Sequence, residues 1–167
     1  MQRLVEENLN RDEYIFILRH LFSFYSVIEK RLVQFPDLVR HVPDLQARLK
    51  VKQLTKDLTQ LGVTDFVSDM DESSLEINNL SDVFGIMYVL EGSSLGSQLI
   101  LRQLQKKSFF SSEVCHFFSG YETQTGVMWR NFLSYLEAAF SSGAIKQRDT
   151  VAAARKTFEA LNFSLPN

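Results

Sequence analysis

The sequence has a single cysteine, Cys115, and only three prolines and seven glycines among its 167 residues. One cysteine cannot form an intramolecular disulfide, and it cannot supply the several thiolates of a structural zinc site. The scarcity of proline and glycine argues against an all-β sandwich, which needs frequent turns. We therefore expect Cys115 to be a small buried hydrophobic residue of a protein in the reducing cytoplasm.

Long apolar runs and a strong excess of one charge are also missing. No uninterrupted apolar run approaches the roughly 20 residues that span a bilayer. The first residues, MQRLVEENLNRDEY, lack the apolar core of a signal peptide. The net charge of −2 gives no general reason to expect a polyanionic partner. We expect neither nucleic acid nor a membrane as a partner.

Aromatic residues and helical periodicity are abundant instead. The chain contains 14 phenylalanines, and apolar residues recur every three or four positions over 13–34, after a capping-box pair, Asn10 and Glu13. Similar patterns predict further helices. Their ranges are 45–62, ended by Gly62; 82–107, capped by Asn79 or Ser81 and ended by Lys106 and Lys107; 125–143, ended by Gly143; and 146–165, capped by Asp149. Residues 67–82 are expected to form a loop. The chain is predicted to be one all-α domain, residues 1–167, a bundle of about six helices.

A cluster of small residues, EGSSLGSQ, interrupts the most apolar of these helices. Gly92 and Gly96 lie four positions apart, and each glycine costs a helix about 1 kcal/mol relative to alanine. Something must therefore approach this helix closely. Spacing leaves two explanations open, namely a neighbouring helix or a flat, wide ligand.

The stretch YVLEGSSLGSQLI resembles the distal-helix motif of the heme oxygenase family, especially its short bacterial branch associated with bacteriophytochromes. Three other segments resemble that branch in the same order. They are LRHLFSFYSVIEKRL, FFSGYETQTGVMWRNFLSYLEAA and AAARKTFEAL. The distal motif is the specific one, and the others support it by order and spacing.

The resemblance implies a heme that is both cofactor and substrate, held between a proximal and a distal helix. It implies that Gly92 and Gly96 contact the heme face through their backbones. Ser93 stands where some relatives carry an acidic residue that orders a catalytic water, and Ser97 replaces the second glycine of a pair. These positions, with Gly92, Ser93 and Gly96 as catalytic and Ser97 as substrate-binding, are our candidate site.

Two further residues belong to the candidate substrate-binding set. Arg130 matches a basic position that pairs with a heme propionate, and an arginine suits a carboxylate because its planar group donates two hydrogen bonds. Tyr88, one turn before Gly92, is either a propionate contact or an aromatic of the core or rim. Trp129 and Phe132 are expected to pack inside the protein.

The proximal side departs from the family pattern. The family carries an iron-ligating histidine on its first helix, whereas pattern alignment puts Met1 or Gln2 at that position. We therefore expect a proximal helix whose start is shortened or absent, either by divergence or by a start codon assigned too late. The remaining histidines are His20, His41 and His116, of which His20 is the nearest substitute ligand.

Two functions remain open on these grounds. The first is a heme-degrading monooxygenase that yields biliverdin, iron and carbon monoxide, with a ferredoxin or reductase as electron donor and a bilin-accepting photoreceptor downstream. The second is a non-catalytic protein of the same fold that binds heme or a bilin. A di-iron oxygenase or a thiamine-pyrimidine hydrolase is disfavoured, because Glu113 and His116 form only one Glu-x-x-His unit and Cys115 stands alone.

Overall fold

The computed structural model describes residues 4, 6, 8–66 and 76–161, and within these ranges it contains helices and no strand. Five helices are long. They are α1 (Arg11–Gln34), α4 (Val51–Gln60), α5 (Leu80–Leu104), α7 (Thr125–Ser141) and α8 (Gln147–Ala160). Three single turns accompany them, α2 (Leu38–His41), α3 (Leu45–Arg48) and α6 (His116–Ser119), with short 3-10 segments at Ser112–Val114 and Glu122–Gln124. The all-α prediction is confirmed.

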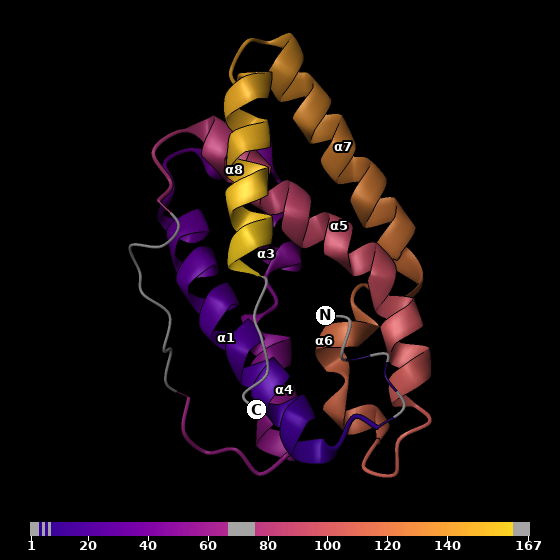
Figure 1. The fold of residues 1–167 in the computed structure, drawn as a ribbon. Coiled ribbons are helices and arrows are strands. Elements are labelled where there is room, and N and C mark those ends of the chain that lie inside the picture. The colour runs from indigo at the N-terminus through magenta and orange to yellow at the C-terminus, as the bar shows by residue number, and fades with distance from the viewer. Residues whose placement is uncertain (1–3, 5, 7, 67–75, 162–167) are drawn as a thin grey trace.

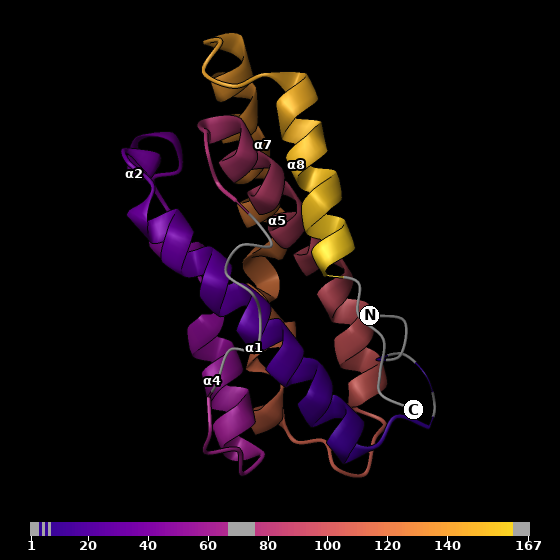
Figure 2. The same cartoon turned by 60° about the vertical axis from the view of Figure 1, so that its left-hand side comes forward.

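Helix α5 runs through the middle of the molecule (Figures 1 and 2). It packs against α8, α7 and α6, while α1 packs against α4. The largest fully buried side chains are aromatic and come from α1, α5, α6 and α7: Tyr14, Phe24, Phe84, Phe118 and Phe132. The phenylalanine-rich composition therefore forms a shared core between these helices.

Most predicted helix ends are confirmed. Asn10 with Glu13, and Asn79 with Asp82, form reciprocal capping boxes at the starts of α1 and α5. Gly62 and Gly143 have φ angles of 78° and 72°, which favour glycine directly after a helix. Of the loop expected over 67–82, residues 67–75 lie outside the described residues.

Two terminal assignments were wrong. Helix α8 begins two residues before Asp149, and its N-cap residue, Lys146, makes no side-chain cap. The Lys146 backbone N–H instead donates to Ser81 Oγ at 3.0 Å, so a neighbouring helix satisfies it. Helix α5 ends at Leu104, before Lys106 and Lys107, and the Lys107 ammonium group donates to the carbonyl of Glu6 at 2.5 Å.

The single helix predicted over 45–62 is split into α3 and α4. The break falls at Leu49 and Lys50, where the backbone N–H groups of Lys50 and Val51 donate to the carboxylate of Glu29 on α1. Glu29 thereby takes the place of an N-cap for α4. The continuous helix is lost because a carboxylate 21 residues away in sequence binds the N–H groups at this point.

Among the described helices, α5 is long and apolar enough to cross a membrane, judged by length and composition alone. The search for uninterrupted apolar runs in the sequence did not single it out, because that search allowed no polar residue within the run. Half of its most apolar 18-residue window is buried inside the protein. A core helix of a globular protein passes the same test. The packing of α5 against three other helices matches that case.

Gly85 is the position where α5 and α8 approach most tightly. A Cβ atom added to Gly85 would lie 2.4 Å from the carbonyl oxygen of Thr150 and 2.7 Å from the Cβ of Ala153. Both atoms belong to the backbone or to a short side chain of α8, so neither can swing aside. This glycine therefore serves helix packing, which was one of the two explanations considered for Gly92 and Gly96.

We expect Gly85→Ala to destabilise the protein by about 1–3 kcal/mol, because the added methyl group forces α5 and α8 apart. Gly96→Ala is the matched control, since an added Cβ there meets no atom within 4 Å. It should stabilise the helix by up to about 1 kcal/mol through propensity. Urea denaturation of the two variants measures both effects. Equal stabilities would contradict the packing role of Gly85.

Candidate functional site

The second half of α5 presents an open face. Tyr88, Leu95 and Leu99 are exposed to 44%, 48% and 59%, and Gly96 lies on the same exposed side. Gly85, which packs on α8, precedes Gly92 by seven residues, or about two helical turns, so both lie on one stripe of the helix. The first half of this stripe is therefore covered by α8, whereas the second half is not.

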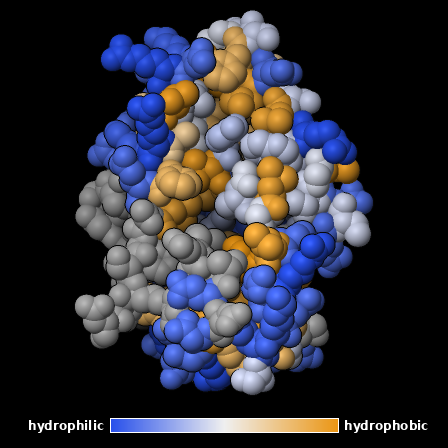
Figure 3. Space-filling view, turned by 45° about the vertical axis from the view of Figure 1, so that its right-hand side comes forward, coloured by the Kyte–Doolittle hydropathy of each residue, from blue (hydrophilic) through white to orange (hydrophobic). Residues whose placement is uncertain are grey.

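The two predicted glycines differ in their surroundings. A Cβ added to Gly92 would meet the ring of Trp129 at 3.7 Å, whereas one added to Gly96 would meet nothing within 4 Å. Helix packing thus explains Gly92 in part and leaves Gly96 unexplained. Figure 3 brings the α7 side of the molecule forward and shows apolar residues in its middle, bordered by hydrophilic ones. Among the described residues, no neighbouring side chain or helix accounts for the glycine at position 96.

The serines of the motif point in different directions. Ser93 lies on the exposed side, and its hydroxyl donates to the carbonyl of Leu90 at 2.7 Å. Burial raises the pKa of the Tyr25 phenol, and a hydrogen bond with the Ser93 side chain opposes that rise. Ser93 is thus connected to a buried phenol on α1. Ser97 is 7% exposed and faces inward, away from the open side of Gly96.

The candidate propionate contacts lie at the rim. Arg130 is exposed on α7, and its guanidinium group lies beside Gly126, one turn earlier in the same helix. The ring of Tyr88 lies 5.4 Å from that of Trp129, centroid to centroid. Trp129 also stacks on the fully buried Phe132 at 6.0 Å, so both aromatics pack as predicted. Tyr88 is a rim aromatic in this structure.

A buried ion pair joins α5 to α3. Glu91, directly before Gly92, is 4% exposed, and its Oε2 accepts from the Arg48 guanidinium at 2.6 Å. Its Oε1 accepts from the hydroxyl of Tyr121 at 2.8 Å. Arg48 also donates two hydrogen bonds of 2.7 Å to Asp44. Every polar atom of the Glu91 carboxylate therefore has a partner, as a buried charge requires.

Two more ionisable groups join this cluster. Burial raises the pKa of Glu29 to about 7, although the backbone N–H groups of Lys50 and Val51 oppose the rise. Burial also lowers the pKa of Lys50 to about 8, against the attraction of Glu91 and Glu29. We call Glu29, Arg48, Lys50, Glu91 and Tyr121 the buried polar cluster. It contains two groups that change charge near neutral pH.

The sequence interpretation missed this cluster. One signal for it was present, because Glu91 continues the buried stripe formed by Phe84 and Met87 at spacings of three and four. A carboxylate on a core stripe requires a buried cation or donors. Those partners come from α3 and from the segment after α6, and the local sequence pattern does not show that these segments lie beside Glu91.

The described histidines occupy three separate places. His20 is half-buried on α1, and burial lowers its pKa, which favours the neutral imidazole that iron ligation requires. His41 ends α2. The ring of His116 lies 2.7 Å from the fully buried carboxylate of Asp57. Met1 and Gln2, at the expected ligand position, lie outside the described residues.

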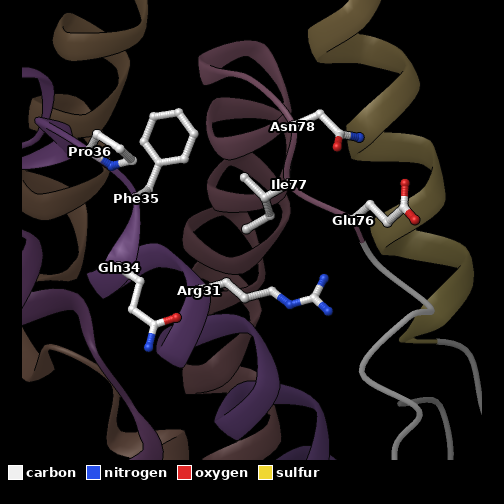
Figure 4. Close-up of a pocket in the computed structure, with 7 residues that line it drawn as sticks. All are labelled: Arg31, Gln34, Phe35, Pro36, Glu76, Ile77 and Asn78. Atoms are coloured by element: carbon white, nitrogen blue, oxygen red, sulfur yellow. The ribbon is translucent and has the colours of Figure 1, made fainter.

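Two of the hollows elsewhere on the described surface are not lined by the predicted glycine or serine positions. One, of about 520 Å³, lies between the end of α1 and the segment before α5, with Arg31, Phe35 and Ile77 in its wall (Figure 4). The other, of about 660 Å³, lies between α4, the end of α5 and α6, with Cys115 and His116 in its wall. Cys115 is buried and carries no disulfide, as predicted.

We expect Glu91→Ala to destabilise the protein by about 2–4 kcal/mol, because it removes one of the two carboxylates that pair with the buried Arg48 and leaves the Tyr121 hydroxyl without its acceptor. The control is Asp65→Ala, which removes an ion pair of the same 2.6 Å length, to Arg19, at an exposed position. That change should leave stability almost unaffected. Chemical denaturation distinguishes the two. A small effect at Glu91 would show that the cluster does not anchor α5.

Comparison with known proteins identifies the family of this chain. Residues 1–165 match the family model described as heme oxygenase. The chain is 31% identical over 160 residues to the heme oxygenase of Xanthomonas campestris pv. campestris (strain 8004), an alignment that covers 95% of this chain and 92% of that protein. A family match over nearly the whole sequence and a relative of this similarity lead to one conclusion. The chain belongs to the heme oxygenase family.

Proposed function

We propose that this protein binds heme on the open face of α5 and degrades it to biliverdin, iron and carbon monoxide. One observation carries the proposal. A Cβ added to Gly96 would meet no described atom within 4 Å, whereas Gly85 on the same helix packs tightly against α8, and Gly96 lies in the motif by which the sequence resembles the family. Family membership supports heme degradation at the level of the class.

The residues present on this face suit a porphyrin. Leu95 and Leu99 offer exposed apolar surface near Gly96, and glycine allows a planar ring to approach the helix backbone. Trp129 borders the face at Gly92. Arg130 lies on the same helix as Trp129 and is exposed, so it is our choice for a propionate partner.

Oxygen activation would be supplied by the heme iron, which is also part of the substrate. The contribution of this chain is to position the heme and to hold a water molecule beside it. Ser93 is the residue that we assign to this water, since its hydroxyl lies on the exposed side and is connected to the Tyr25 phenol. A hydroxyl carries no charge, so it holds such a water less firmly than a carboxylate would.

Two further elements are part of the proposal. His20 is the described histidine that we would test first as an iron ligand, because burial keeps its imidazole neutral. The reaction needs electrons from outside the protein, and we propose a ferredoxin or a reductase as the donor. Supply of a bilin to a photoreceptor in the cytoplasm is the downstream role that we infer from the resemblance to the bacterial branch.

A second function is favoured by one specific observation. Met1 or Gln2 stands at the position that the resemblance assigns to the proximal histidine, and neither residue carries an imidazole. A protein of this fold without an iron ligand would bind heme or a bilin through the apolar face and Arg130 and would not turn it over. The two functions differ in the spectrum of the complex.

Titration of the protein with hemin, followed by ascorbate under air, tests the proposed function. Turnover predicts a sharp Soret band and its conversion to the biliverdin spectrum, and His20→Ala should then broaden that band if His20 is the ligand. A broad spectrum like that of free hemin, with no biliverdin, would contradict turnover and support the binding protein.

We expect Gly96→Leu to weaken hemin affinity at least about tenfold, because the side chain fills the space assigned to the ring. Ala152→Leu is the matched control, since Ala152 is an exposed position on α8 away from this face. Both variants should keep the stability of the parent chain. Equal hemin affinities, measured by visible titration, would remove the Gly96 face from the binding site.

A further inference from the structure

Lys50 is a buried lysine in the break between α3 and α4. Lys50 is 7% exposed, and its ammonium nitrogen has no hydrogen-bond partner among the described residues. The nitrogen lies 3.4 Å from the centroid of the Tyr121 ring, over its face. A buried ammonium group without hydrogen bonds is costly, and the π face of an aromatic ring offsets part of that cost.

The Tyr121 ring connects this charge to the open face of α5. The face of the ring lies against the Lys50 ammonium group, and the hydroxyl group of the same ring donates to Glu91 at 2.8 Å. Glu91 is followed directly by Gly92. Two contacts, from Lys50 to Tyr121 and from Tyr121 to Glu91, therefore link the charge of Lys50 to the helical segment that we assign to heme.

We propose that Lys50 is a positioning residue for the open face of α5. Its ammonium group holds the Tyr121 ring and, through that ring, Glu91, so porphyrin binding and protonation of Lys50 are coupled. The inference rests on the proposed function, because it assigns a porphyrin to this face. It goes beyond that function by naming a residue that does not touch the ligand and yet sets its affinity.

Charged and titratable groups surround Lys50 on every element packed against it. Glu29 lies on α1, Arg48 on α3, Glu91 on α5 and Tyr121 after α6. The two carboxylates favour the ammonium form, while burial and Arg48 oppose it. Burial has the largest effect and brings the pKa of Lys50 to about 8. The group therefore changes charge in a pH range that a binding experiment can cover.

The direction of the coupling follows from the cation–π contact. Only the ammonium form of Lys50 makes this contact with the Tyr121 ring, so loss of the proton loosens the ring that donates to Glu91. Porphyrin binding should then favour the protonated form of Lys50, and by reciprocity the affinity should fall as the pH passes from 7 to 9. A substitution that removes the amine should abolish this fall.

The experiment uses zinc protoporphyrin IX, which binds without oxygen chemistry. Binding is followed through quenching of Trp129, the single tryptophan of the chain, whose ring lies beside Gly92. We expect the affinity of the parent protein to decrease about fivefold between pH 7 and pH 9. Lys50→Met should show less than a twofold change. Lys50→Arg, which stays charged throughout, should remain near the parent value at pH 7.

Lys52→Met is the control, because Lys52 is an exposed lysine two residues away on α4. It should keep the full fall in affinity between pH 7 and pH 9. Lys50→Gln provides a second neutral variant if Lys50→Met does not fold, as judged by circular dichroism. Binding with the same pH dependence in the parent and the neutral Lys50 variants overturns the coupling alone. Absence of porphyrin binding in the parent protein overturns the proposed function, and the coupling with it.

Discussion

The pairing of Glu91 with Arg48 is the interaction on which the arrangement of α5 depends. The Glu91 carboxylate is 4% exposed, whereas Leu95, one turn later, is 48% exposed. A helix with so few large side chains at this point would gain little from apolar packing alone. The ion pair and the Tyr121 hydroxyl hold α5 at Glu91, directly before the turn that carries Gly96 and the exposed leucines.

The glycines of α5 have different surroundings within one helix. Gly85 admits α8 to close contact, whereas a Cβ added to Gly96 would meet no described atom within 4 Å. The difference arises from the partner helix and not from the glycines, because α8 covers the first half of the stripe and leaves the second half uncovered. A tightly packed stretch and an uncovered stretch thus follow one another along α5, and Trp129 lies beside Gly92 between them.

Local signals in the sequence were sufficient for much of the fold. The capping boxes at Asn10 and Asn79 and the end at Gly62 depend on neighbours within a few residues, so they could be predicted. The position of Gly92 and Gly96 on one side of a helix followed from spacing. Which of them meets a neighbour did not, because that depends on residues far away in the chain.

The buried polar cluster is the part of the site that sequence reasoning could not assemble. Its members come from α1, α3, α5 and the segment after α6, and they are brought together only by the tertiary structure. The same is true of Ser97, which the motif placed at the ligand and which the helix turns inward. A motif gives the order of residues, whereas the phase of the helix decides which of them face outward.

The contact of Glu29 with the N–H groups of Lys50 and Val51 has a consequence for the order of folding. The first turn of α4 takes its cap from a side chain on α1, so this turn is not a purely local structure. The isolated segment 45–62 would have every local reason to form one continuous helix. Docking of α1 would then be the event that divides it, and a long-range contact would have to form before α4 reaches its native boundary.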